Sequence, residues 1–171
     1  MKAGLPSFIF IRHAETEWNA LGLTMGQRDI PATDAGISIA RENVVGLSYQ
    51  VPWIVSSSLV RALKTAAVFS QGSVSIKVSD LWMERDWGPF EGQPKACRPN
   101  EPNPPEVEPW STFVARVQLG IKSLPNSDLG MVVSHSGVFK ALMYIGYRPE
   151  SSLAKVPHAT PIILKDGRID V

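Results

Sequence analysis

The chain has 171 residues and a formal net charge of +1, and 44% of its residues are hydrophobic. This length fits one compact domain, and the apolar fraction is enough for a real core, so a disordered chain is excluded. The near-neutral charge gives no reason to expect nucleic acid or membrane partners, although a local cluster of cations could bind a small anion.

The cysteine content and the N-terminal region indicate in which cellular compartment the protein is expected. Cys97 is the single cysteine, which excludes an internal disulfide framework, and its proline-rich surroundings indicate an exposed bystander thiol. The apolar run over residues 8–11 is too short for a signal peptide, and no stretch is long enough to span a bilayer. We therefore expect a soluble, cytoplasmic protein.

Short apolar runs alternate with helical patterns along the chain. The first half predicts a strand over residues 7–11, a helix capped by Thr33, a strand over 53–56, a helix over 59–70, and a strand or sheet edge over 74–78. The second half predicts a proline-rich loop over 97–109, a helix capped by Ser111 or Thr112, a strand over 129–134, a helix over 137–145, a strand over 160–164, and a turn at Asp166-Gly167.

This alternation predicts an α/β fold, a three-layer sandwich whose central sheet is mostly parallel and covered by helices on both faces. Residues 1–171 show no internal repeat and no clear linker, so we expect a single domain with a short proline-rich excursion at about 93–109.

Polar residues follow three of the predicted strands directly. They are Arg12-His13, Ser56-Ser57-Ser58 leading to Arg61, and Ser134-His135-Ser136. In sheets of this class, ligands bind outside the carboxyl ends of the strands, so we expect these residues to converge on one site.

Arg61 lies in the first turn of its predicted helix, where a cation is disfavoured unless an anion binds at the same end. Taken alone, Arg61 is more simply explained as turning out to solvent or pairing with a carboxylate. The two strand-end histidines, His13 and His135, could be structural hydrogen-bonders, but a neutral imidazole can also attack phosphorus, with arginines neutralising the oxygens. A metal site is not expected, because His158 lies far along the chain and no pair of histidines has ligand spacing.

Five motifs follow one another from about Ile11 to Leu142. They are Arg12-His13-Ala14-Glu15-Thr16-Glu17-Trp18-Asn19; Gly26-Gln27-Arg28-Asp29-Ile30-Pro31 with Thr33 and Gly36; Ser56-Ser57-Ser58-Leu59-Val60-Arg61-Ala62 with Thr65-Ala66; Glu84-Arg85-Asp86-Trp87-Gly88 with Glu91-Gly92; and Val133-Ser134-His135-Ser136-Gly137 with Lys140-Ala141-Leu142. In this order and spacing the chain resembles the histidine phosphatase superfamily, also called phosphoglycerate mutase-like.

The resemblance implies a role for each matching residue. His13 would be the nucleophile that forms a phosphohistidine, and Glu84 the general acid that protonates the leaving oxygen and then activates water. Arg12, Arg61 and His135 would hold the phosphoryl oxygens, with Asn19 as a further phosphate contact. No metal and no organic cofactor would be needed for hydrolysis.

The chain departs from the family pattern at two positions. Ala14 and Ser136 stand where the family usually has glycine. The methyl group of Ala14 needs only ordinary backbone angles. Ser136 could bind phosphate or could cap the helix that follows it. Glu84 could also be a solvated carboxylate beside core aromatics, and only the resemblance singles it out.

The leading functional prediction is a phosphatase for phosphomonoesters of small metabolites, which releases inorganic phosphate. The alternative is a protein phosphatase that acts on phosphohistidine or other phospho-residues. A phosphoglycerate mutase is disfavoured because the segment from Gly92 to Trp110 is short, holds six prolines and offers only Lys95 and Arg98 for a second anion. A serine hydrolase at Ser136 lacks the glycine of the nucleophile elbow, and a non-catalytic phosphate-binding module would be expected to lack one of the catalytic residues.

Overall fold

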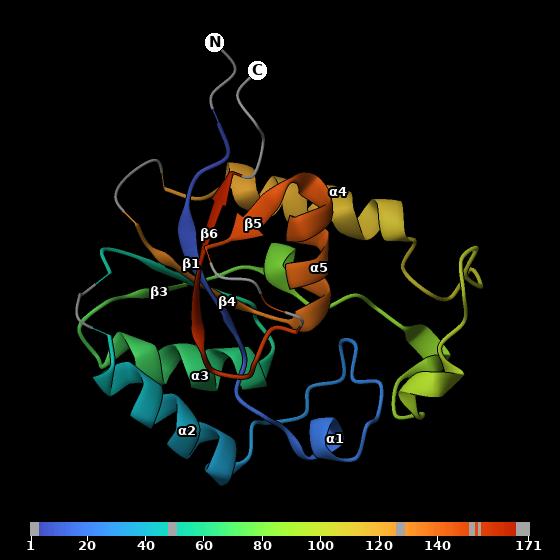
Figure 1. Cartoon of the computed structure of the whole chain (residues 1–171). Helices are drawn as coiled ribbons and strands as arrows, with labels where there is room; N and C mark the ends of the chain where they lie inside the picture. The colour runs from blue at the N-terminus through green and yellow to red at the C-terminus, as the bar shows by residue number, and fades with distance from the viewer. Residues whose placement is uncertain (1–3, 48–50, 126–128, 151–152, 154, 167–171) are drawn as a thin grey trace.

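A six-stranded sheet forms the middle layer of the computed structural model, which describes residues 4–47, 51–125, 129–150, 153 and 155–166 (Figure 1). The strands are β1 (Phe8–Arg12), β2 (Ile54–Ser56), β3 (Ile76–Val78), β4 (Met131–Ser134), β5 (Tyr147–Pro149) and β6 (Pro161–Asp166). Their order across the sheet is β3-β2-β4-β1-β6-β5. The first four in this order are parallel neighbours, whereas β6 pairs antiparallel with both β1 and β5.

Strand β1 lies in the sheet interior and is apolar on both faces. Phe8 and Phe10 belong to the core on one side, and Ile9 and Ile11 to the core on the other. All four are fully buried. Since successive strand residues point to opposite faces, an unbroken apolar run is what a sheet covered on both sides requires.

Two pairs of helices cover the two faces. Helices α2 (Asp34–Val45) and α3 (Val60–Ser70) pack on the side of Ile9 and Ile11, and α4 (Trp110–Lys122) and α5 (Ser136–Ile145) on the side of Phe8 and Phe10 (Figure 1). A short helix α1 (Glu17–Ala20) and the 3₁₀ turns η1 (Asp80–Trp82), η2 (Gly88–Phe90) and η3 (Lys95–Cys97) lie in the connections. The predicted three-layer α/β architecture is confirmed.

The N-terminus of a helix lies where the sequence predicts it when a side chain caps that helix. The Thr33 hydroxyl accepts a hydrogen bond from the Gly36 N–H at 3.0 Å, as expected of the cap of α2. The prediction that Ser111 or Thr112 caps α4 is wrong. Pro109 occupies the cap position (φ −58°, ψ 142°) and makes no side-chain cap bond. The helix begins at Trp110.

The ends of several other elements also differ from expectation. Strand β5 and the 3₁₀ turns were not predicted, because each is too short to show a periodicity. Asp166 is the last residue of β6, and Gly167, the second residue of the predicted turn, lies outside the described residues.

Buried apolar surface, ion pairs and hydrogen bonds tie the proline-rich excursion to the body of the protein. Val107 is buried in the protein. The Arg85 and Glu101 side chains meet at 2.6 Å, and Arg116 pairs with Glu108 at 2.9 Å. These anchors position the excursion beside the carboxyl ends of the strands. Within the described residues, no helix is long and apolar enough to cross a membrane.

Candidate active site

The carboxyl ends of three neighbouring parallel strands meet at one edge of the sheet. Arg12 of β1 is in register with Ser134 of β4, and Ser56 of β2 with Val133. The backbone pairing continues past the strands, since the His13 N–H donates to the Ser134 carbonyl at 2.9 Å. The convergence of strand ends that the sequence predicts is therefore confirmed.

His13 lies directly after β1 and is only 2% exposed. Its Nδ1 lies 2.7 Å from the Ala14 carbonyl oxygen. Because a carbonyl only accepts, Nδ1 carries the proton, and the lone pair of the neutral ring is on Nε2. Burial, followed by the positive charge of Arg61, holds the pKa of His13 well below its usual value. The ring is therefore neutral at pH 7.

His135 lies beside His13 and is fully buried. The two ring centroids are 5.2 Å apart, and Nε2 of His135 lies 2.8 Å from the Ser57 hydroxyl oxygen. Its Nδ1 is buried without a hydrogen-bond partner among the described residues. Burial, and then the charge of Arg61, lowers the pKa of His135 well below its usual value. His135 packs beside His13 and is not among the residues that line the pocket.

His158 lies beside His13, although the sequence analysis gave it no role because it is far along the chain. Its ring centroid lies 5.4 Å from that of His13, and its Nδ1 is 2.8 Å from the His13 carbonyl oxygen. Burial, and then the charge of Arg12, lowers its pKa to about 4. The sequence carries no local signal for this position, because it depends on the antiparallel pairing of β6 with β1, which puts the start of β6 beside the end of β1.

Arg61 follows neither of the two alternatives considered for it alone. Its side chain is fully buried, and its two terminal nitrogens donate to the carbonyls of Gly26 and Arg28, each at 2.7 Å. Burial lowers its pKa to about 10. The Asp29 carboxylate, at 2.7 Å from the Val60 N–H, supplies the anion at the start of α3. Arg61 lies behind the pocket wall, where its charge acts on both buried histidines.

Arg12 lines the pocket, and its Nη1 donates to the Val156 carbonyl at 3.1 Å. Its Nε, like that of Arg61, is buried and has no partner among the described residues. Burial lowers the pKa of Arg12, against the nearby charges of Glu84 and Glu15. A buried donor without a partner on a residue that lines the pocket indicates a missing acceptor, and an anion beside His13 fits that description.

Glu84 lines the pocket at the start of α5, and the alternative of a freely solvated carboxylate is wrong. Its Oε2 accepts from the Gly137 N–H at 3.0 Å, and its Oε1 from the Arg85 N–H at 2.8 Å. A Cβ on Gly137 would lie 1.9 Å from Oε1, so glycine is what allows this approach. The carbonyl of Glu84 accepts from Gln27 and Arg116, which fixes the backbone beneath the carboxylate.

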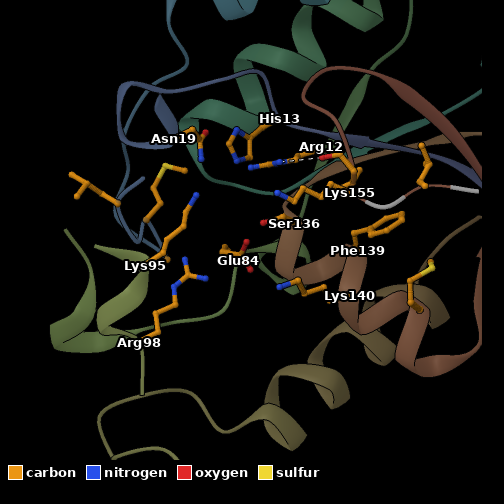
Figure 2. A pocket seen from close by; sticks show the side chains of 16 residues that line it. Arg12, His13, Asn19, Glu84, Lys95, Arg98, Ser136, Phe139, Lys140 and Lys155 are labelled. Atoms are coloured by element: carbon orange, nitrogen blue, oxygen red, sulfur yellow. Dashed lines mark hydrogen bonds between the residues drawn. The ribbon is translucent and has the colours of Figure 1, made fainter. Parts of the chain in front are cut away.

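Asn19 and Ser136 also line the pocket. The Asn19 Oδ1 accepts from the backbone N–H and the hydroxyl of Thr16 at 3.1 and 3.0 Å, which turns the amide nitrogen toward the pocket (Figure 2). Ser136 is the first residue of α5, and the cap position belongs to His135, which makes no side-chain cap bond. The capping alternative for Ser136 is therefore wrong, and its hydroxyl lies beside the pocket.

The pocket in front of His13 has a volume of about 550 Å³, which suits a small organic ligand. Its apolar lining comes from Leu23, Met25, Phe139, Met143, Leu153 and Val156. Its cationic lining comes from Arg12, Lys95, Arg98, Lys140 and Lys155, with Glu84 as the carboxylate (Figure 2). Lys140 and Lys155 are cations beyond the two that the sequence alone offers for a second anion. Within the part of the chain that the structure describes, no three His, Cys, Asp or Glu side chains are grouped as metal ligands.

A model of the histidine phosphatase superfamily (branch 1) matches residues 8–160. This range contains every residue of the site described above. The chain belongs to the histidine phosphatase superfamily. The superfamily contains both phosphatases and mutases, so the chain is an enzyme of this group.

Relatives of both kinds are similar to the chain. A Bacillus subtilis protein named uncharacterized phosphatase PhoE is 31% identical over 144 residues, which cover 78% of this chain and 73% of the relative. The 2,3-bisphosphoglycerate-dependent phosphoglycerate mutase of Actinobacillus succinogenes is 32% identical over 111 residues, 60% of this chain. The match spans only 48% of that mutase, so the chain corresponds to about half of its length.

Solved structures share the fold over nearly the whole chain. The phosphoglycerate mutase from Thermus thermophilus superimposes with a TM-score of 0.76 at 25% sequence identity and covers 92% of each chain. YhfR of Bacillus stearothermophilus has a TM-score of 0.74 at 24% identity and covers 81% of this chain and 78% of its own. The phosphoglycerate mutase-like fold implied by the sequence is confirmed.

Proposed function

We propose that the chain is a phosphatase that hydrolyses phosphomonoesters of small metabolites through a phosphohistidine on His13. The observation that carries this proposal is the bond between Nδ1 of His13 and the Ala14 carbonyl at 2.7 Å. It leaves the Nε2 lone pair as the nucleophile, and the lowered pKa keeps the ring unprotonated at neutral pH.

In the first step, Nε2 of His13 attacks phosphorus and the P–O bond to the leaving group breaks. The protonated Glu84 carboxyl gives its proton to the departing oxygen. In the second step, Glu84 takes a proton from water, the resulting oxygen attacks phosphorus, and the P–N bond to His13 breaks. Inorganic phosphate leaves, and both side chains return to their starting states.

Positive charge around His13 would stabilise the transferring group. Arg12 and the amide of Asn19 face the pocket, and the Ser136 hydroxyl lies at its edge. Arg61 and His135 would act from behind His13, and each terminal nitrogen of Arg61 carries a second N–H beyond the one already bonded. Such preorganised donors are effective because they need no reorientation during the reaction.

The test is a His13→Ala variant compared with the wild type in the presence of EDTA. The wild type should hydrolyse small phosphomonoesters and take up an acid-labile phosphoryl group, and the variant should do neither. Substantial turnover by the variant, or a phosphoryl group trapped on Ser136, would contradict the assignment.

A phosphoglycerate mutase is the second candidate, because mutases are among the relatives and the pocket holds more cations than one phosphate needs. A mutase must exclude water while the phosphoryl group returns to another hydroxyl. The excursion after Gly92 contains only the three-residue turn η3 before α4, and we infer an open site that water reaches. Phosphorus NMR with 3-phosphoglycerate separates the two, since 2-phosphoglycerate forming faster than inorganic phosphate would favour the mutase. The protein phosphatase stays an alternative that a panel of phosphopeptides tests.

A further inference from the structure

Helix α5 turns one continuous stripe of side chains toward the pocket. Ser136, Phe139, Lys140 and Met143 all line it, at the spacing i, i+3, i+4 and i+7 that places residues on one helix face. Since a helix rises 1.5 Å per residue, Lys140 lies about 6 Å and Met143 about 10 Å along the axis from Ser136. The pocket therefore extends along α5, away from the phosphate end.

The segment that leads to His158 adds to the lining of this extension. Leu153, Lys155 and Val156 line the pocket there. Apolar side chains from the two segments thus line the extension together, and each segment adds one lysine. A leaving group with an apolar body would be removed from water along this length.

The charge of the pocket exceeds what the reacting phosphate uses. Five cations line it against the single carboxylate of Glu84 within the described chain, although the whole protein has a formal net charge of only +1. Figure 2 shows that Lys95 and Arg98 enter from one side and that Lys140 and Lys155 enter from the other. Partial burial, together with the charges of Arg12, Arg98, Lys155 and Lys140, lowers the pKa of Lys95, which indicates that these cations act on a common space.

Three of these cations, Lys95, Lys140 and Lys155, have no side-chain partner among the described residues. Arg98 is already held, because its Nε donates to the Thr24 hydroxyl at 2.9 Å and its guanidinium lies 4.6 Å from the centre of the Trp87 ring. Lys140 and Lys155 take part in no ion pair and no side-chain hydrogen bond with the described residues. Lys140 lies on the stripe of α5, away from Arg12 and Asn19, and Lys155 lies between Lys140 and Arg12 (Figure 2).

We propose that the leaving group of the substrate lies along α5, with an apolar body against Phe139 and Met143 and a second anionic group bound by Lys140 and Lys155. This inference rests on the proposed phosphatase function, since it takes the phosphoryl group to lie at His13. The substrate class is a phosphomonoester that carries a carboxylate or a further phosphate beyond an apolar spacer. Charge-assisted hydrogen bonds from the two ammonium groups supply the recognition.

Binding of two non-hydrolysable phosphonates tests the proposal without requiring turnover. Both probes carry an arylmethyl phosphonate with a para chain, which ends in a propanoate in one and in the neutral propanamide in the other. By calorimetry at low ionic strength, the propanoate should bind the wild type about tenfold more tightly than the amide, a ratio that corresponds to one charge-assisted contact. High salt should reduce the ratio, because both lysines are exposed to solvent.

The lysine variants locate the effect. Lys140→Gln and Lys155→Gln should each lower the ratio of the two affinities, and the double variant should bring it to about one. Lys64→Gln is the matched control, because Lys64 is an exposed lysine on α3 that does not line the pocket. It should keep the wild-type ratio.

Two further outcomes would overturn the inference, and a third concerns only the proposed function. Equal affinity of the wild type for the two probes, or no binding of either, rules out the second-anion site. A preference that survives in the double variant assigns the recognition to other residues. If the preference is found but the corresponding phosphates are never hydrolysed, the second-anion site stands and the phosphatase proposal fails.

Discussion

The Glu84 carboxylate is held by two backbone N–H groups at the entrance to α5, next to the place where the leaving oxygen would depart. Glu84→Gln removes the transferable proton and keeps the size of the side chain. Esters with poor leaving groups should therefore lose about two to four powers of ten in rate, the range of general acid catalysis. Activated aryl phosphates should phosphorylate His13 with a smaller loss, because their leaving oxygens need little protonation.

Pre-steady-state phosphorylation rates of the two ester types provide the measurement. An equal loss on both would assign Glu84 a structural role and direct attention to Asp86, which also accepts a backbone hydrogen bond in this loop.

We infer that His158 is a positioning residue, which acts on the site through the backbone of His13. Its Nδ1 donates to the His13 carbonyl, and Ala159 pairs with the Arg12 carbonyl beside it. His158→Leu removes the donor and should lower kcat by about tenfold with little change in KM, because a small displacement of the nucleophile costs rate more than binding. His158→Asn, which can donate the same bond, should recover most of the loss. If His158→Leu has the kcat of the wild type, the positioning role of His158 is contradicted.

At the scale of elements, helix α5 joins catalysis to local packing at Gly137. Its N–H binds Glu84, and an added Cβ would meet that carboxylate at 1.9 Å. The helix propensity of alanine favours folding, whereas displacing Glu84 removes its hydrogen bond to the start of α5, so Gly137→Ala should change the free energy of unfolding by no more than about 1 kcal/mol. Hydrolysis of alkyl phosphates should nevertheless fall, because the carboxylate must move.

Urea unfolding measures the effect of Gly137→Ala on stability, and steady-state kinetics on the same protein measure its effect on activity. Lys64→Ala is a suitable control, since it places alanine at an exposed helical position of α3 that does not line the pocket. Full activity of Gly137→Ala on alkyl phosphates would show that the observed position of Glu84 is not needed.

The elements that the sequence predicts well are those with a local signal. Thr33 caps α2 through its own side chain, and the strand ends at His13 and His135 converge because parallel strands share an edge. His158 was missed because its place depends on the antiparallel pairing of β6 with β1, which no local pattern encodes. Lys140 and Lys155 became visible only when α5 and the segment before β6 were seen to face one pocket. Glu84 was found through the family resemblance alone.

At the scale of the whole molecule, the site places three histidines in surroundings that disfavour their charged forms. Burial is the leading cause of the lowered pKa of His13, His135 and His158, and nearby arginines add to it. In the unfolded chain each histidine would titrate near pH 6.5. Between that value and the lower pKa of the folded state, the unfolded chain binds more protons than the folded protein does.

The free energy of unfolding should therefore be highest above about pH 6.5 and should fall as the pH is lowered from there toward about 4, the pKa of His158. Each fully buried histidine contributes a slope of at most about 1.4 kcal/mol per pH unit. Urea unfolding at pH 7.5, 6.5, 5.5 and 5.0 measures this slope. His158→Asn should reduce the slope by the contribution of one histidine, because asparagine does not titrate. An exposed substitution such as Lys64→Gln should leave the slope unchanged. A wild-type protein whose stability is constant from pH 7.5 to pH 5.0 would show that the three rings are not held neutral by the fold.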